Sequence, residues 1–357
     1  MRKFGVEEEL LLVDAADLRP APVGAAVSAT ETTPLEHEFK QEQVEIGSSP
    51  QLETAELREE LVRLRAEADQ AAKARGASVV AIATSPWKLS PRVTPDQRYH
   101  RMVAEFGLLA REQLTCGQHV HVEVASRAEG VAVLDRIRGW LPALLALSAN
   151  SPYWQGQDTG YASFRNVLWG RWPTAGPTDL FGDEAGYDNR IASLIEAGAA
   201  LDDGMIYFDA RLSARYPTVE IRVADVCTDV DDAVLVAALA RGLVDTAAAQ
   251  WRAGQPASPI STPVLRAASW RAARWGLDSS LIAPDTRRPA PAWAVIDQLL
   301  DWTAESLRRH GDADLVAAGV NRIRSGGGGA ARQRAAFTRF EQWYAVVADA
   351  ARRTVAG

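Results

Sequence analysis

The sequence contains few cysteines and no long hydrophobic run. Two cysteines among 357 residues cannot form a disulfide framework and are typical of a reducing compartment. No stretch approaches the roughly 18 apolar residues of a membrane span, and acidic residues appear where a signal peptide would place its apolar core. These absences predict a cytoplasmic protein that does not contact a membrane.

The sequence also has no excess of positive charge. The formal net charge is −7, which argues against a general nucleic-acid or anionic-membrane surface but leaves room for a local phosphate pocket. The hydrophobic fraction of 47% and the charged fraction of 24% are ordinary for a globular protein. A length of 357 residues predicts one large domain or two ordinary ones.

The usual nucleotide and zinc motifs are missing. The sequence has no Walker loop, no kinase-type glycine loop and no His-Glu-x-x-His helix, and no lysine follows a glycine-rich turn. Five histidines are too few to favour a histidine-dominated metal site. Any phosphate or metal chemistry must therefore come from another arrangement of residues.

The hydrophobic pattern predicts an α+β fold, because strands and helices alternate irregularly and do not form βαβ units. Expected strands cover residues 4–13, 36–46, 78–84, 118–124, 205–211 and 218–224. Expected helices cover a segment from Thr54, as N-cap, to Gly76, then 97–114, 131–149 and most of the chain after about 230. Residues 150–190 are expected to be rich in loops. An antiparallel sheet backed by helices accounts best for this order.

Three of the expected strands pair an apolar face with an ionisable face, because side chains two residues apart point the same way. The ionisable faces carry Glu7 and Glu9, then His119, His121 and Glu123, then Glu220 and Arg222. The second extended segment adds Glu38 and Glu45. One position is even and the other odd, so on one regular strand they would point to opposite faces, and both can face the same side only if a bulge or break lies between them. Ordinary half-solvated strands would show alternation too. However, surface strands rarely carry so many acids and histidines together.

If these side chains converge, cations must neutralise them or their pKa values must rise. Oxygen-rich ligand sets suit magnesium or manganese, with an occasional histidine. An acidic, cation-binding cavity with arginines suits phosphoryl transfer, which needs charge neutralisation and positioning. Arg222, Arg211 and Arg165 are candidate donors to phosphate or carboxylate groups.

Several segments resemble motifs of glutamate–cysteine ligase family 2, the short bacterial carboxylate–amine ligases related in fold to glutamine synthetase. They are Gly5–Leu10, Gln41–Ile46, Cys116–Val122, Ala149–Gly156, Arg171–Pro177, Thr218–Arg222 and Gly329–Arg334. The likeness covers nearly the whole chain. It implies a curved antiparallel sheet that forms a funnel for ATP and metal ions. Residues 1–254 would then form the catalytic sheet-and-helix region, and 255–357 a helical region packed on the same domain.

The resemblance also implies roles for individual residues. Metal ligands would be Glu7, Glu9, Glu38, Glu45, His119 and Glu220. His121, Arg222 and Arg211 would bind the nucleotide phosphates, with Arg222, Arg211 and Glu220 as catalytic residues. Arg165 would bind the acceptor carboxylate, and Tyr153 and Trp169 are further expected substrate contacts.

The expected reaction is ATP-dependent joining of a carboxylate, such as that of glutamate or another amino acid, to an amine through an acyl phosphate. The resemblance also suggests a homo-oligomer, a dimer. Departures from the family pattern at Glu42, Glu123 and Ser213–Pro217 leave the acid and the amine open. Two other hypotheses remain: a metal-dependent hydrolase or cupin-like enzyme built on His119, His121 and Glu123, and a non-catalytic nucleotide or metabolite-binding homologue.

Smaller features have plainer interpretations. Glu8 is expected to be an ordinary residue at the sheet margin, and Cys116 a small buried side chain. The glycine-rich segment 326–329 reads as a linker, although Arg332 and Arg334 beyond it could instead close over the site.

Overall fold

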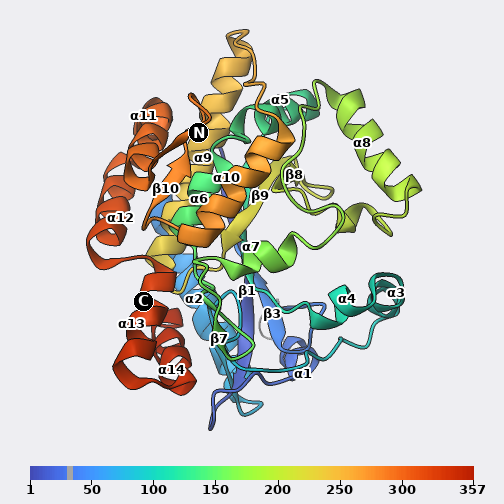
Figure 1. Cartoon of the computed structure of the whole chain (residues 1–357), viewed down its shortest axis with the longest axis vertical. Helices are drawn as coiled ribbons and strands as arrows, with labels where there is room; N and C mark the ends of the chain where they lie inside the picture. Colours follow the sequence, from blue (N-terminus) through green and yellow to red (C-terminus); the bar gives the residue numbers. More distant parts are fainter. Residues whose placement is uncertain (30–34) are drawn as a thin grey trace.

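The computed structural model describes residues 1–29 and 35–357, and its central element is an antiparallel sheet (Figure 1). Six strands follow the order β2-β3-β1-β5-β9-β8, and β4 pairs with β1 off this path. Their bounds are β1 Phe4–Asp14, β2 Glu36–His37, β3 Gln43–Gly47, β4 Ala77–Val80, β5 Gly117–Glu123, β8 Ala210–Leu212 and β9 Thr218–Asp225. The predicted α+β fold with an antiparallel sheet is confirmed.

The register brings ionisable positions of neighbouring strands opposite one another. The opposed pairs are Glu9–Glu45, Glu7–His119, His121–Glu220 and Arg211–Glu220. Because directly opposed side chains share a face of the sheet, the register gathers these groups on one side. The expected break between Glu38 and Glu45 is present, since β2 ends before Glu38 and β3 begins at Gln43.

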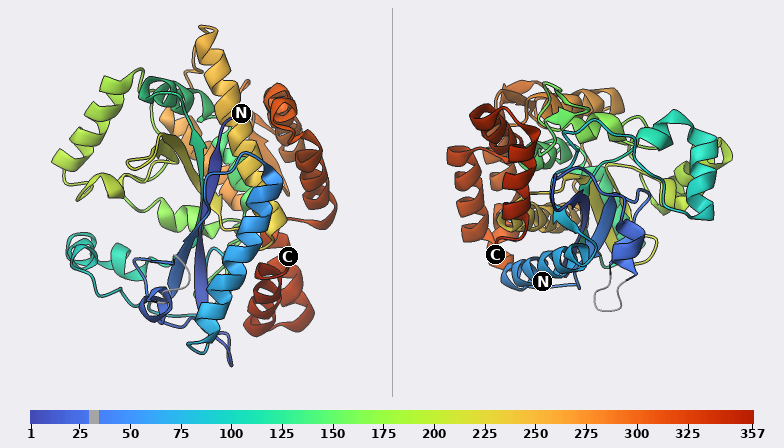
Figure 2. Two further views of the ribbon diagram at one scale, coloured as in Figure 1. Left: turned by 180° about the vertical axis from the view of Figure 1, so that it is seen from behind. Right: turned by 90° about the horizontal axis from the view of Figure 1, so that it is seen from below.

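The other face of the sheet is apolar and covered by helices. Val6, Leu10, Val120 and Val122 are fully buried there. The helices that pack near this face are α2 Thr54–Lys73, α5 Arg127–Ile137, α6 Leu141–Ser148 and α9 Val230–Arg252. In the left view of Figure 2, α2 and α9 run side by side across the sheet. Each fully buried aliphatic side chain contributes about 1.5–3 kcal/mol, so this layer anchors the strands.

Two expected helices are divided. Gly107, with φ of 56°, separates α3 (Gln97–Phe106) from α4 (Leu108–Glu112). The expected 131–149 helix begins earlier, as α5, and breaks before α6, whose first turn contains Pro142. The N-cap of α2 is Glu53, so the prediction of Thr54 as the cap was wrong by one residue.

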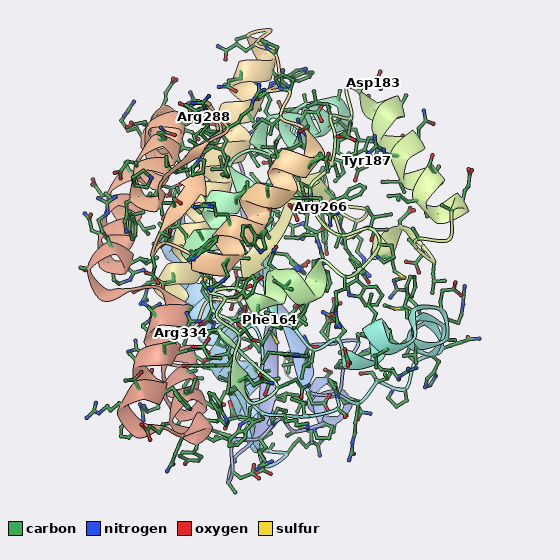
Figure 3. The ribbon with its side chains drawn as sticks, viewed as in Figure 1. Phe164, Asp183, Tyr187, Arg266, Arg288 and Arg334 are labelled. Atoms are coloured by element: carbon green, nitrogen blue, oxygen red, sulfur yellow. The ribbon has the colours of Figure 1, made fainter. Side chains whose placement is uncertain are left out.

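The remaining elements surround this framework. They are α1 Gly24–Ser28, β6 Tyr153–Trp154, β7 Gln157–Asp158, α7 Phe164–Trp169, α8 Glu184–Glu196, η1 Asp203–Met205, α10 Thr262–Trp275, β10 Ser280–Ile282, β11 Pro289–Pro291, α11 Ala292–His310, α12 Ala313–Gly326, α13 Gly329–Phe340 and α14 Trp343–Thr354. The stretch 150–190, expected to be mostly loop, thus contains α7 and the start of α8. In Figure 3, Tyr187 lies on the side of α8 that faces the sheet.

The C-terminal helices pack on the rest of the chain. Helix α10 contacts α6, α11 and α12 contact α9, and α14 contacts β4. The division at residue 254 stays a prediction. None of the helices formed by the described residues has the length and apolar character that crossing a membrane requires.

Candidate active site

A cavity of about 950 Å³ opens on the face of the sheet away from α2 and α9. Ten of the predicted site residues line it: Glu7, Glu9, Glu38, Glu45, His119, His121, Trp169, Arg211, Glu220 and Arg222. Strands β1, β3, β5, β8 and β9 supply most of them, and Glu38 comes from the connection between β2 and β3. Residues from five strands, from the connection between β2 and β3 and, for Trp169, from α7 therefore meet in one hollow.

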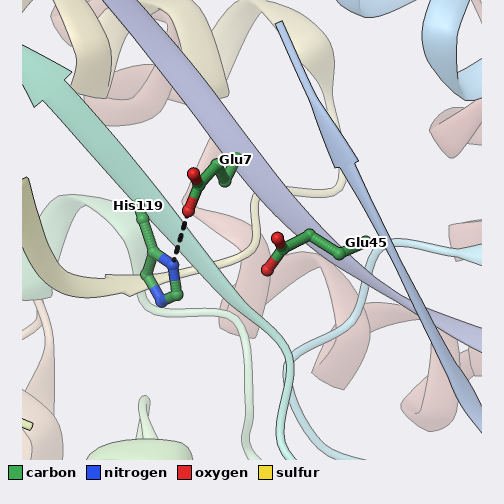
Figure 4. Close-up of side chains that lie close together, drawn as sticks. All are labelled: Glu7, Glu45 and His119. Carbon is green, nitrogen blue, oxygen red and sulfur yellow. Dashed lines mark ion pairs between the residues drawn. The ribbon is translucent and has the colours of Figure 1, made fainter. Parts of the chain in front are cut away.

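Three overlapping groups of these side chains could each hold a cation. The groups are Glu7–Glu45–His119, Glu7–His121–Glu220 and Glu9–Glu38–Glu45, and the candidate ligand atoms within each lie within 4.8 Å of one another. Figure 4 shows the ion pair between Glu7 and His119, with the carboxylate of Glu45 beside it. Glu7 and Glu45 each belong to two groups, so neighbouring ions would share ligands.

The carboxylates of Glu38 and Glu45, on the β3 side, lie close to one another, and the charge of Arg222 offsets only part of the effect on Glu38. Burial raises the pKa of Glu38 to about 7, and the carboxylate of Glu9 adds to this rise. Burial and the nearby carboxylate of Glu38 raise the pKa of Glu45 well above its ordinary value. These groups would need a proton or a cation to lie so close together.

The carboxylates on the β5 and β9 side are held ionised. Burial opposes ionisation of Glu7, but hydrogen bonds from His119 and His121 outweigh it and lower the pKa of Glu7. Burial likewise opposes ionisation of Glu220, yet the guanidinium groups of Arg222 and Arg211 lower the pKa of Glu220.

Glu220 is fully engaged by the two arginines. Arg211 Nε donates to Oε2 at 2.7 Å, and Arg222 Nη1 donates to Oε1. Arg211 also donates to the carbonyl of Ile206 at 3.0 Å. The arginines expected to bind phosphate thus hold a carboxylate in this structure, which leaves Glu220 fewer free lone pairs for a cation.

The residues present fit a divalent cation. Nε2 of His119 is buried and has no hydrogen-bond partner among the described residues. Burial and the charge of Arg222 lower the pKa of His119, which favours the neutral imidazole that binds metals. A set of carboxylate oxygens with one or two imidazoles is chemically suited to magnesium or manganese.

A family model for glutamate-cysteine ligase family 2 matches residues 3–350. A Streptomyces coelicolor protein named "Putative glutamate--cysteine ligase 2" is 49% identical over 362 residues, with 100% of both chains covered. A Frankia alni protein named "Putative glutamate--cysteine ligase 2-2" is 50% identical over 357 residues, covering 95% of this chain and 93% of its own. The chain belongs to glutamate–cysteine ligase family 2. It is a ligase of that type, an ATP-dependent enzyme that forms an amide bond.

Solved structures share the fold at low sequence identity. The glutamate–cysteine ligase of Francisella tularensis, crystallised with AMP, superposes with a TM-score of 0.71 at 14% identity, covering 99% of this chain and 88% of that one. A bifunctional glutathione synthetase from Pasteurella multocida gives a TM-score of 0.70 at 14% identity, covering 99% and 52%. The architecture is therefore that of known amide-forming ligases.

Two expected substrate contacts in this ligase lie outside the cavity lining. Tyr153 is buried among aromatic rings, with Phe337 and Trp343 at centroid distances of 5.7 and 4.9 Å. Arg165 is only 2% exposed, and its guanidinium lies 3.9 Å from the carboxylate of Asp225. The family resemblance implied substrate binding for both, but Tyr153 packs against α13 and α14 and Arg165 is buried beside β9, so neither side chain reaches the cavity.

Glu8 departs most from its expected place. Its carboxylate is fully buried and accepts two hydrogen bonds from Arg65, at 2.6 and 2.8 Å. The partner lies on α2, 57 residues away, so strand parity alone could not reveal it. Cys116 is buried, as predicted.

The arginines beyond the glycine-rich segment also lie away from the cavity. Arg332 pairs with Asp229 and Asp232, and Arg334, which is labelled in Figure 3, pairs with Asp158 at 2.8 Å. These contacts attach α13 to the body of the protein, which differs from the idea that the two arginines close over the site.

Other cavity residues were not predicted as site residues. Tyr207 stacks obliquely on Trp169 with centroids 4.7 Å apart, and an Arg98–Asp202 pair at 2.8 Å joins two segments of the lining. The expected strand 205–211 is shorter in the structure, where β8 covers only Ala210–Leu212, so Tyr207 lies outside the strand and strand alternation does not place it. The Arg98–Asp202 pair joins positions 104 residues apart, and no local pattern points to it.

Proposed function

We propose that this enzyme activates the carboxylate of an amino acid, with glutamate the first candidate, and joins it to an amine. A carboxylate oxygen attacks the γ-phosphorus of ATP and ADP leaves, giving an acyl phosphate. The amine nitrogen then attacks the acyl carbon, loses a proton, and expels inorganic phosphate. The names of the relatives, and the AMP bound to the Francisella tularensis ligase, support this choice of substrates and nucleotide.

The observation that carries the proposal is the meeting of carboxylates, imidazoles and guanidinium groups in one cavity. Phosphoryl transfer needs neutralisation and positioning of a highly charged group more than it needs a covalent nucleophile. Among the residues described, no lysine lines the cavity, and the hydroxyl of its Ser213 accepts hydrogen bonds from the backbone of Arg215 and Tyr216 and none from a histidine.

The metal-binding residues of the proposal are Glu7, Glu9, Glu38, Glu45, His119 and Glu220. Divalent cations bound there would supply positive charge to the phosphate oxygens of ATP. Arg211 and Arg222 would donate hydrogen bonds to those oxygens, since guanidinium groups bind phosphate in bidentate fashion. His121, which is hydrogen-bonded to Thr218 at 3.0 Å, is held at the same wall.

A phosphate-release assay tests the proposal. Purified enzyme with ATP and magnesium is screened against pairs of amino acids and amines, beginning with glutamate and cysteine. Phosphate should appear only when ATP, metal, acid and amine are all present, and mass spectrometry should show the amide. If no substrate pair released phosphate while ATP still stabilised the fold, the result would instead favour a non-catalytic nucleotide-binding homologue.

The hydrolase hypothesis receives less support from the geometry. It requires Glu123 beside His119 and His121, but Glu123 does not line the cavity and accepts a hydrogen bond from the backbone of Lys3 at 3.1 Å. A cytoplasmic location stays a prediction of the composition, and a homodimer stays a prediction of the family resemblance. Size-exclusion chromatography with light scattering would test the dimer.

A further inference from the structure

A β-bulge interrupts the pairing of β5 with β9 beside the cavity. Gln118 lies opposite Ala224 and Val120 lies opposite Ile221. Two residues of β9, at positions 222 and 223, therefore face the single residue at position 119. A bulge of this kind leaves ladder groups unpaired and redirects side chains, and here it lies where Arg222 enters the cavity.

Arg165 occupies the gap that the bulge leaves. Its Nη2 donates to the carbonyl of Arg222 and its Nη1 to the carbonyl of Val223, both at 3.4 Å. These bonds are long, but the donor is charged, which strengthens them in a buried setting. The guanidinium of Arg165 thus satisfies the carbonyls of Arg222 and Val223, the first of which directly follows the Cα that carries the Arg222 side chain.

The guanidinium is fixed from two further directions. On the β5 side it lies against Gly117, where an added Cβ would come 2.1 Å from Nη2. On the other side lies Asp225, whose carboxylate accepts hydrogen bonds from the Asn150 backbone and from the hydroxyls of Ser151 and Ser163, at 2.7 to 2.8 Å. Only glycine at position 117 leaves the guanidinium room against the strand.

Trp169 stands between this arrangement and the cavity. The guanidinium carbons of Arg165 and Arg222 lie 5.7 and 6.0 Å from the centroid of its ring. Trp169 lines the cavity and Arg165 does not. A substrate in the cavity therefore meets the indole and the side chain of Arg222, with Arg165 behind them.

We infer that Arg165 is a positioning residue, which holds the bulge of β9 so that Arg222 points at the phosphate end of ATP. It is not, on this geometry, the ligand of an acceptor carboxylate. The inference rests on the proposed function, because it assigns Arg165 an effect on ATP through Arg222.

Steady-state kinetics of Arg165→Lys separate the two roles. A lysine keeps the charge but cannot reach both carbonyls at once. We expect the KM for ATP to rise about tenfold, because small misplacements of a positioning contact are costly, while the KM for the amine stays within about twofold. Asp225→Asn should also raise the KM for ATP, but by a smaller factor. Thermal-shift titration with magnesium and ATP should show the same weakening without turnover.

Arg138→Lys is the matched control. Arg138 is also buried and donates to backbone carbonyls, those of Thr178 at 2.7 Å and Ser258 at 3.0 Å, but it does not line the cavity. Its replacement should lower the melting temperature and leave the KM for ATP unchanged.

Three results would overturn the inference. The first is a raised KM for the amine with an unchanged KM for ATP in Arg165→Lys. The second is an equal change of the KM for ATP in Arg138→Lys, which would mark a general loss of stability. The third is wild-type kinetics in Arg165→Lys. A wild-type enzyme that releases no phosphate with any substrate pair would instead refute the proposed function, and the inference with it.

Discussion

The charge of each carboxylate in the cavity depends on its nearest partners. Glu7 and Glu220 face imidazoles and guanidinium groups, which lower the pKa of each carboxyl. Glu38 and Glu45 face other carboxylates, and burial with this repulsion raises the pKa of both. The charges of Glu7 and Glu220 are therefore balanced within the protein, whereas Glu38 and Glu45 need a bound proton or a cation to lie so close together.

Glu9→Gln should abolish ligase activity and preserve the fold. Glu9 belongs to the group with Glu38 and Glu45, and its Oε2 accepts from the Gly117 backbone at 2.5 Å. The amide keeps the shape but removes one charge of the cation site, so we expect a loss of about 100-fold or more in phosphate release. Circular dichroism and melting temperature would check the fold. Glu123→Gln, on β5 but outside the cavity, is the control, and equal losses in both variants would contradict the assignment.

Glu8→Gln should destabilise the protein strongly. The Glu8–Arg65 pair has no exposed side-chain surface, so the substitution leaves a buried guanidinium without its counter-charge. Removal of one partner from such a pair costs about 3–5 kcal/mol. Urea unfolding would measure this, with Glu67→Gln as the comparison, since its partner Arg63 is 55% exposed and the expected cost is below about 1 kcal/mol. A Glu8 variant no less stable than the Glu67 variant would contradict this account.

At the scale of elements, the sequence predicted the strands of the site better than its helices. Alternation is strict in β5, and the two-residue spacing of Glu7 with Glu9 and of Glu220 with Arg222 identifies the ionisable sides of β1 and β9, because a period of two is typical of strands. Helical periodicity continues across Gly107, so the break between α3 and α4 depends on a backbone conformation that the pattern does not record. The β5–β9 bulge depends on contacts with Arg165, which lies on α7.

The junction of the N-terminus with α9 and α11 should weaken in acid. Asp245 of α9 accepts from Arg2 at 3.0 Å and from Arg309 at 2.7 Å, and lies 3.5 Å from His310. Burial opposes its ionisation, but His310 and Arg2 lower the pKa of Asp245 below the ordinary 3.8. A lowered pKa in the folded state gives stability that is present above pH 3.8 and is lost as the pH falls below it.

The measurement is the difference in unfolding free energy between wild type and Asp245→Asn. We expect about 1.5–3 kcal/mol at pH 7, because the hydrogen bonds to a charged acceptor are lost. The difference should shrink as the pH falls below about 4. Asp231→Asn, whose partner Arg58 is 40% exposed, should show a small difference that hardly varies. If the difference in unfolding free energy between wild type and Asp245→Asn stayed constant down to about pH 2.5, the pKa of Asp245 would not be lowered in the folded protein.

For the whole molecule, what the sequence could predict was that acids on separate strands share a pocket. Two-residue alternation placed Glu7, Glu9 and Glu220 on the ionisable faces of their strands. The strands must pair so that their apolar faces are buried on the same side of the sheet, which brings the ionisable faces together on the other side. Parity could not place Arg165 and Tyr153, because their stretch of chain has no regular period. Their positions depend on how the connection through 150–165 packs behind the sheet, which the register of the strands does not determine.

The acidic cavity should make the stability of the whole chain depend on divalent cations. A ligand that binds only the folded state adds about 2.7 kcal/mol at a hundredfold excess over its Kd. We therefore expect magnesium or manganese to raise the melting temperature and EDTA to reverse the rise, at constant ionic strength. Glu45→Gln should reduce the rise, since Glu45 belongs to two of the three candidate groups, whereas Glu123→Gln should keep it. An equal rise in both variants would mean that the cations bind outside this cavity. No rise in the wild type would mean that the folded protein does not bind them. Only a site built from these carboxylates links the charge at position 45 to the stability of the fold.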